Sequence, residues 1–165
     1  LFVAIFSILQ FLSPLVGNKI NLKNLNYIVS FFSISSFILL TISFSILILA
    51  YVNSDFSLLN VWSNSHTSKP LIYKISGSWG NHEGSMLLWC WVMSLYGFLV
   101  AINFQKISSN FKIRILMFQG ILSFGFITFL KFKSNPFEKL FPIPESEVTL
   151  PFVVLIPVLI LFPNG

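Results

Sequence analysis

A histidine and a glutamate stand side by side where a polar stretch gives way to a long apolar run. The stretch reads Ser78-Trp79-Gly80-Asn81-His82-Glu83-Gly84-Ser85-Met86-Leu87-Leu88-Trp89. An imidazole beside a carboxylate is a pair that could move protons, so this pair is a possible active site. We expect Ser78 or Asn81 to cap the helix that follows, which places Glu83 in its first turn, where the helix dipole favours negative charge.

Two interpretations of Glu83 remain open. On helical spacing it shares one face with small and polar residues, namely Cys90, Ser94, Gly97 and Ala101. Such a stripe is typical of helix–helix packing inside membrane bundles, and Glu83 would then be the charged end of a packing surface. Alternatively, Glu83 faces a cofactor or substrate cavity, because an acid near a membrane usually faces a partner or water.

The sequence predicts no catalytic and no metal-binding residue. The two histidines, His66 and His82, lie 16 positions apart, and no acid or cysteine stands at ligand spacing from them. We interpret His82 as a hydrogen-bonding interface residue. Cys90 is the single cysteine, so no internal disulfide can form. The sequence has no phosphate-binding loop, Ser/His/Asp set or pair of catalytic carboxylates.

Four tryptophans lie in or near the same region. Trp62 and Trp79 suit the aromatic belt at a membrane surface. Trp89 and Trp91 are two positions apart and so point to different faces of one helix. These two side chains could line a flat apolar ligand or face lipid.

The composition is that of an integral membrane protein. Of 165 residues, 55% are hydrophobic and 9% are charged, whereas a soluble domain has about 25% charged residues. The formal charge of +5 comes from basic residues scattered through short loops, which disfavours a nucleic-acid-binding face. Abundant Phe, Ile, Ser, Asn and Lys beside little Ala and Arg indicate an AT-rich, often organellar, coding sequence.

We predict an all-α fold, a polytopic membrane helical bundle that forms one domain over residues 1–165. A helix needs about 20 mostly apolar residues to cross the hydrocarbon core. On that basis four transmembrane helices are expected, at 1–16, 27–52, 84–104 and 115–131. The serines and threonines of the second span are expected to bond to the helix backbone or to a neighbouring helix.

The remaining segments fix the expected topology. Basic loops at 18–26 and 105–114 fall on one side of the membrane, which the positive-inside rule assigns to the cytoplasm or matrix. An external loop at 53–82 and the segment after Lys131 then face the opposite compartment. An apolar tail at 148–162 is broken by prolines and is expected to be interfacial, re-entrant or shielded by a partner, with a fifth full span as the alternative.

Several segments resemble the CcmF family, the membrane haem lyases of cytochrome c maturation. They are Asp55-Phe56-Ser57, Asn64-Ser65, Pro70-Leu71-Ile72-Tyr73-Lys74, the stretch from Trp79 to Trp89, and Ser134-Asn135-Pro136-Phe137-Glu138-Lys139-Leu140 with Pro142 and Pro144. The family-motif and interface residues predicted from this resemblance are Asp55, Trp79, Gly80, His82, Glu83, Gly84, Ser85 and Trp89. Lys69, Asn81 and the tail after Glu147 depart from the family pattern.

The resemblance implies a role in attaching haem to the Cys-x-x-Cys-His of apocytochrome c. The family's haem ligands belong to later motifs, which this sequence lacks, so haem is expected to be held by a partner fragment and not by this chain alone. The chain would be the amino-terminal fragment of a split haem lyase, catalytically incomplete by itself. Its expected partners are the remaining fragments, haem, apocytochrome c and membrane lipid, with no nucleic acid.

The expected location is the mitochondrial inner membrane, with the bacterial plasma membrane as the alternative. Whether the chain is an enzyme stays open at this point. The alternative function is a non-catalytic structural subunit of a larger respiratory or transport assembly.

Overall fold

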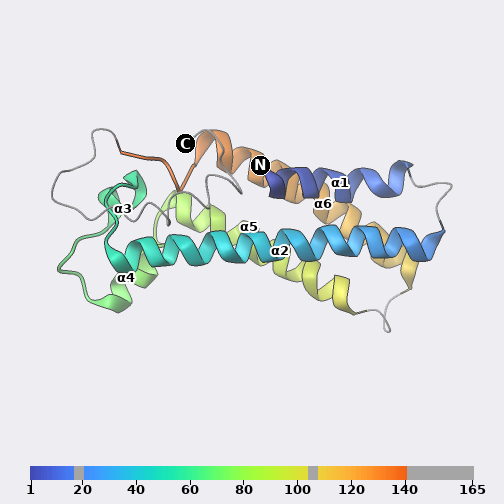
Figure 1. Cartoon of the computed structure of the whole chain (residues 1–165), viewed down its shortest axis with the longest axis horizontal. Helices are drawn as coiled ribbons and strands as arrows, with labels where there is room; N and C mark the ends of the chain where they lie inside the picture. Colours follow the sequence, from blue (N-terminus) through green and yellow to red (C-terminus); the bar gives the residue numbers. More distant parts are fainter. Residues whose placement is uncertain (17–20, 104–107, 141–165) are drawn as a thin grey trace. The chain divides into compact units, whose positions relative to one another are not determined.

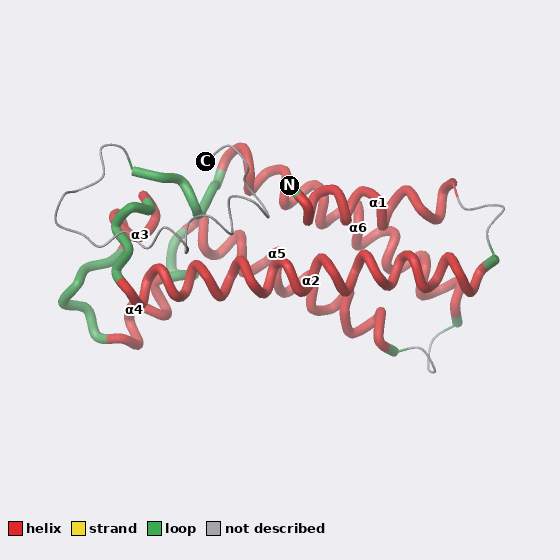
Figure 2. The backbone as a smooth tube through the Cα atoms, in the orientation of Figure 1, coloured by secondary structure: helices red, strands yellow, loops and turns green. Residues whose placement is uncertain are grey.

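The described residues of the computed structural model are 1–16, 21–103 and 108–140, and they fold into helices without any strand (Figures 1 and 2). The helices are α1 (Phe2–Val16), α2 (Leu22–Asn53), α3 (Leu59–Asn64), α4 (Leu71–Gly77), α5 (His82–Ile102) and α6 (Ser109–Lys133). The predicted all-α fold class is therefore confirmed. The apolar tail at 148–162, Pro142, Pro144 and parts of both basic loops lie outside the described residues.

Three of these helices, α2, α5 and α6, are long and apolar enough to cross a membrane. The chain is an integral membrane protein. α1 is apolar but shorter, at 15 residues. α2, α5 and α6 begin before the expected spans at 27, 84 and 115, because hydropathy marks only the part of a helix that matches the hydrocarbon, whereas backbone hydrogen bonding continues into polar residues.

The described chain forms two compact units. The helical unit comprises Phe2–Thr41 and Cys90–Thr128. The loop unit comprises Ile42–Trp89 and 129–140, together with Leu1. α2, α5 and α6 each pass from one unit into the other.

The core of the helical unit brings together three helices. Leu25 and Val29 of α2 pack with Ala101 of α5 and with Ile113 and Leu116 of α6. The start of α2, the end of α5 and the start of α6 thus meet at one place. The helix ends that flank the two basic loops therefore lie at the same end of this unit, as the alternation of spans predicts.

Side-chain amides attach α1 to α6 within the helical unit. Gln10 is buried, and its Nε2 donates to the Leu116 carbonyl at 2.7 Å and to Gln119 Oε1 at 2.7 Å. A Cβ placed on Gly120 would lie 2.9 Å from the Ser7 carbonyl oxygen. Glycine therefore lets the two backbones approach closely, as small residues do in membrane bundles.

The small-residue stripe of α5 is a packing surface. Cys90, Ser94 and Ala101 are buried. A Cβ placed on Gly97 would lie 2.5 Å from Gln119 Oε1 of α6. The packing expected from the spacing of these small residues is thus present in the helical unit.

The hydrogen bonds expected for the serines of α2 form only in part. Thr41 Oγ1 donates to the Phe37 carbonyl at 2.8 Å and accepts from Trp91 Nε1 at 2.9 Å. The hydroxyls of Ser30, Ser33 and Ser36 are buried and have no hydrogen-bond partner among the described residues. For these three the expected bonds are not found among the described residues.

α2 ends in a Schellman motif. The Ser54 N–H donates to the Tyr51 carbonyl at 3.2 Å, and the Asp55 N–H donates to the Ala50 carbonyl at 2.9 Å. Ser54 has a φ of 56°, which is the left-handed conformation that this motif needs and that glycine usually supplies. Lys74 Nζ donates to Ser54 Oγ at 2.7 Å and holds this turn against α4.

The segment after α6 returns along the expected external loop. Leu58 and Lys139 form an isolated antiparallel bridge. Beside it the Leu59 N–H donates to the Glu138 carbonyl and the Leu140 N–H donates to the Ser57 carbonyl, each at 2.9 Å. The stretch 53–82 is therefore an ordered part of the loop unit that contains α3 and α4.

Candidate functional site

Asn81 caps the start of α5. Its Oδ1 accepts from the Gly84 N–H at 2.7 Å, which satisfies one of the unpaired backbone donors at the helix start. Ser78 Oγ instead donates to the Ile75 carbonyl at 2.7 Å and belongs to the end of α4. Of the two expected caps, Asn81 is confirmed. Glu83 lies in the first turn of α5, as expected.

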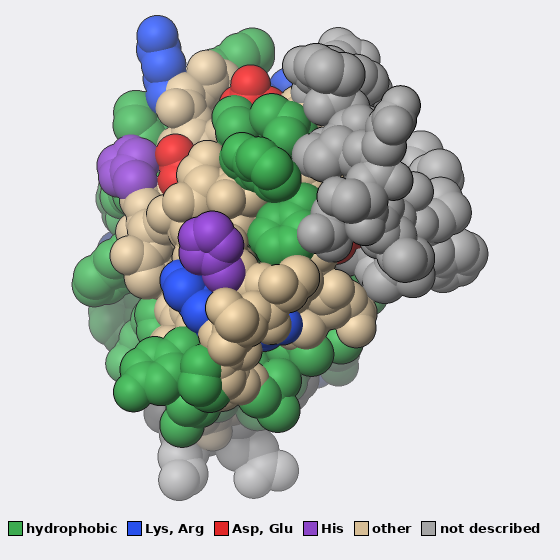
Figure 3. Space-filling view, turned by 90° about the vertical axis from the view of Figure 1, so that its left-hand side faces the viewer, with side chains coloured by type: hydrophobic (Ala, Val, Ile, Leu, Met, Phe, Trp, Pro, Cys, Tyr) green, Lys and Arg blue, Asp and Glu red, His purple; other side chains and the backbone are tan. Residues whose placement is uncertain are grey.

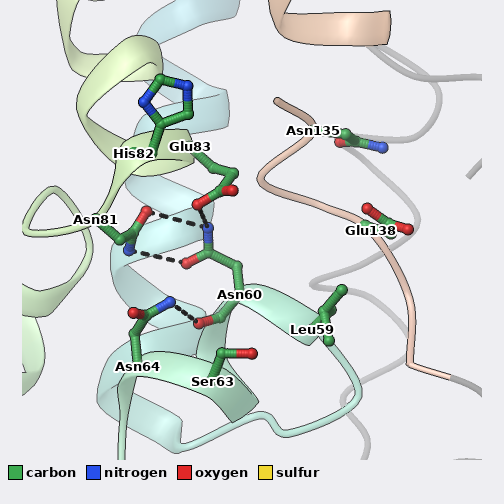
Figure 4. Close-up of a pocket in the computed structure, with 9 residues that line it drawn as sticks. All are labelled: Leu59, Asn60, Ser63, Asn64, Asn81, His82, Glu83, Asn135 and Glu138. Carbon is green, nitrogen blue, oxygen red and sulfur yellow. Dashed lines mark hydrogen bonds between the residues drawn. The ribbon is translucent and has the colours of Figure 1, made fainter. Parts of the chain in front are cut away.

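A buried polar network surrounds this cap. Asn81 Nδ2 donates to the Tyr51 hydroxyl at 2.8 Å. Asn81 Nδ2 also donates to Asn60 Oδ1 at 3.0 Å, and Asn60 Nδ2 donates back to Asn81 Oδ1 at 3.2 Å (Figure 4). The Tyr51 hydroxyl donates to Asn60 Oδ1. Tyr51 and Asn60 are both buried. The ends of α2, α3 and α5 are thereby joined through three side chains that carry no net charge.

Glu83 extends from this network into a pocket of about 440 Å³. Its Oε2 accepts a long hydrogen bond of 3.5 Å from Asn60 Nδ2. On the other side of the pocket are Asn135 and Glu138, from the segment that follows α6 (Figure 4). The described residues that line it are Leu59, Asn60, Ser63, Asn64, Asn81, His82, Glu83, Asn135 and Glu138.

The pocket is polar and carries negative charge. Glu83 and Glu138 both line it, and none of its described lining residues is a lysine or arginine. Lys69 lies nearby in sequence but donates from Nζ to the Asn64 carbonyl at 2.9 Å. On the face shown in Figure 3, charged and histidine side chains lie among hydrophobic and neutral polar ones. Within the described ranges, no three His, Cys, Asp or Glu side chains are grouped so that they could hold a metal ion.

The other residues predicted at the start of α5 have distinct roles. The His82 side chain is exposed, and its ring lies away from the Asn60 amide (Figure 4). Ser85 Oγ donates to the His82 carbonyl at 2.9 Å. Gly84 is buried, and a Cβ placed there would collide with the Ser78 carbonyl oxygen. Glycine is required here by the close approach of the Ser78 backbone.

The remaining predicted residues do not line the pocket. Asp55 is 1% exposed, and its Oδ1 accepts from the N–H and the hydroxyl of Ser57 at 3.1 and 2.6 Å. Trp79 packs on Phe44 with ring centroids 6.4 Å apart. The Gly80 N–H donates to the Gly77 carbonyl at 3.3 Å in a turn.

Trp89 and Trp91 of α5 point in different directions, as their spacing predicts. Trp89 is 62% exposed. Trp91 instead packs inward, with its ring 6.1 Å from Phe37. The two therefore lie on different faces of the helix and do not form one ligand surface.

Sequence reasoning missed the residues that build the rest of the pocket. Tyr51 looks like part of a transmembrane run, and Asn60 like an ordinary loop asparagine. The one sequence pattern that could have indicated α3 is the spacing of Asn60 and Asn64, which puts both on one face of a helix. In the structure Asn64 Nδ2 donates to the Asn60 carbonyl at 2.9 Å. Asn135 and Glu138 are brought in only by the returning segment.

Comparison with known proteins gives consistent results. The family model described as "Cytochrome C assembly protein" matches residues 79–161. The cytochrome c-type biogenesis protein CycK of Rhizobium meliloti (strain 1021) is 41% identical over 138 residues, which cover 84% of this chain and 20% of that protein. The protein CcmF of Escherichia coli (strain K12) is 43% identical over 100 residues, which cover 61% of this chain and 16% of that protein.

A solved structure also has a similar fold. The structure described as "Cytochrome c Heme Lyase CcmF" aligns with a TM-score of 0.74 and 23% identity, over 96% of this chain and 25% of that chain. This similarity concerns the fold alone. The chain spans about a fifth of the length of the curated relatives above.

Proposed function

Because this chain belongs to the cytochrome c assembly protein family, we propose that it forms the amino-terminal part of a haem lyase that attaches haem to apocytochrome c. The relatives are named as cytochrome c-type biogenesis proteins. The remaining parts of the lyase would come from one or more partner fragments. The mitochondrial inner membrane is the proposed location, with the bacterial plasma membrane as the alternative.

The proposed role of this chain is positioning. Thioether formation adds a cysteine thiol across a haem vinyl group, so it needs the thiol and the vinyl carbon held close together, and such positioning supplies a large share of many catalysed rates. The loop unit suits this role because the Tyr51–Asn60–Asn81 network ties the ends of three helices into one rigid surface.

The pocket itself does not fit haem. Cofactor pockets for flat apolar rings are mostly apolar, whereas this one is lined by amide, hydroxyl and carboxylate side chains. Its two glutamates would also repel the haem propionates. We therefore assign haem to the partner fragment and the Glu83 side of the pocket to contact with that fragment or with apocytochrome c.

The observation that carries this proposal is Glu83 in the lining of a pocket built from three segments that are far apart in the sequence. The test replaces Glu83 by glutamine in the cells that normally make the chain, with a tag on the chain. Covalent haem in cytochrome c and co-purification of partner fragments are then measured. Glu83→Gln should lower either the covalent haem in cytochrome c or the yield of co-purified partner fragments about tenfold. A tenfold change corresponds to about 1.4 kcal/mol of lost interaction.

Tyr96→Phe serves as the matched control, because Tyr96 is exposed in the helical unit and lies away from the pocket residues in sequence. Normal cytochrome c and normal association for Glu83→Gln would contradict the proposed role. Recovery of the wild-type chain only with a respiratory complex, without haem or apocytochrome c, would instead favour the structural-subunit function.

A further inference from the structure

α4 exposes three consecutive large apolar side chains. Leu71, Ile72 and Tyr73 are 59%, 72% and 64% exposed, and none of the residues of α4 is buried. Exposed apolar side chains grouped in this way often mark contact with a protein or a membrane. The position of α4 along α2 favours the membrane.

Three contacts fix that position within the loop unit. A Cβ on Gly77 of α4 would lie 3.1 Å from the Tyr51 ring of α2. Lys74 of α4 bonds to Ser54 at the end of α2. Trp79, just after α4, packs on Phe44, seven residues before Tyr51, which is about 10 Å along the helix axis. α4 therefore lies beside the last turn of α2, and Trp79 lies two turns deeper.

The boundary between the hydrocarbon core and the headgroups lies near the last turn of α2. The charge-free run 27–52 has 26 residues and a length of about 39 Å, while the hydrocarbon core is about 30 Å thick. Centred on the core, the run extends about 4–5 Å beyond it at each end, so its last three residues, including Tyr51, lie in the headgroup layer. α4 is held at that depth, and Phe44 and Trp79 lie about 10 Å deeper along the helix axis, toward the acyl chains.

We propose that the exposed apolar first turn of α4, formed by Leu71, Ile72 and Tyr73, together with Trp79, is an interfacial anchor that rests in the boundary between lipid headgroups and acyl chains. Tyr and Trp rings favour that layer because each has an apolar body and a polar tip. The Lys74 ammonium is turned to Ser54 and does not interrupt the apolar turn. This anchor depends on the membrane-spanning fold and not on the proposed haem lyase role.

The test measures the depth of a nitroxide spin label on the full-length chain in nanodiscs of phosphatidylcholine and phosphatidylglycerol. Cys90 is buried and is replaced by alanine to give a background without native thiols. Ile72→Cys carries the label, and Leu71→Cys is a second site in case the first variant does not fold. Thr67→Cys is the control, because Thr67 is exposed in the same loop five residues earlier.

Power saturation with oxygen, which concentrates in lipid, and with a water-soluble nickel chelate separates the outcomes. At position 72 we expect relaxation by oxygen to exceed relaxation by nickel, with the reverse order at position 67. A label at 72 that behaves like the one at 67 would mean a water-exposed turn and would overturn the proposal. Protection from both reagents would mean that protein covers the turn and would overturn it equally.

Discussion

Replacing Asn81 by alanine tests whether one amide both caps α5 and holds the loop unit together. The change removes the acceptor of the Gly84 N–H and the donor to the Tyr51 hydroxyl and Asn60 Oδ1. Loss of an asparagine cap costs about 1 kcal/mol. A buried amide such as Asn60 that loses its partner costs about 1–2 kcal/mol more. The expected loss of local stability is therefore about 2–3 kcal/mol.

Asn81→Asp is the matched variant, because it separates the cap from the network. An aspartate still accepts from the Gly84 N–H, and it can also accept from the Asn60 amide and the Tyr51 hydroxyl after these reorient. It cannot donate, and it adds a charge close to Glu83. We expect a loss of only about 1 kcal/mol for this variant.

Hydrogen exchange of the amides at 82–89, followed by mass spectrometry in mild detergent, measures both changes. A factor of ten in exchange corresponds to about 1.4 kcal/mol. Asn81→Ala should therefore exchange about 30- to 150-fold faster than wild type, and Asn81→Asp about fivefold faster. Exchange of Asn81→Ala within twofold of wild type, or equal exchange of the two variants, would refute the assignment of both roles to this side chain.

Two further predictions concern helix packing. Gly84→Ala should lower the free energy of unfolding by about 1–3 kcal/mol, because the new Cβ meets the Ser78 carbonyl. Gly125→Ala, where a Cβ meets nothing within 4 Å, should be neutral or stabilise by up to about 1 kcal/mol; similar midpoints of the two variants in detergent melting would contradict this. Gln10→Leu should cost about 1–2 kcal/mol in unfolding by sodium dodecyl sulfate, because two inter-helix bonds are lost. Ser13→Ala, which removes only a bond within α1, is its control and should leave the midpoint unchanged.

Short-range patterns in the sequence were sufficient to predict the long helices and the candidate caps of α5. A cap is set by a few neighbouring residues, so Asn81 was among the expected candidates for α5. The stripe that contains Cys90, Ser94, Gly97 and Ala101 was found because helical periodicity is a property of one segment, and its packing face is the one the spacing indicated. The short helices α3 and α4 were not expected, because six or seven residues carry too little periodicity to stand out from a loop.

The pocket and the docking of α1 depend on contacts between residues far apart in the chain. Asn60 meets Asn81 across 21 positions, and Gln10 meets Gln119 across 109. An uncharged asparagine or glutamine looks the same in a sequence whether it is solvated or buried. Only the folded chain shows which of its donors and acceptors are satisfied.

By itself the sequence determined that this protein is a helical membrane protein and narrowed the cap of α5 to Ser78 or Asn81, because hydropathy and capping act over one helix or one turn. Tertiary structure alone decided what Glu83 faces. The same carboxylate could have ended a packing surface or lined a cavity. It lines a pocket because the turn at Ser54 brings Asn60 back to α5 and the chain after α6 returns with Glu138.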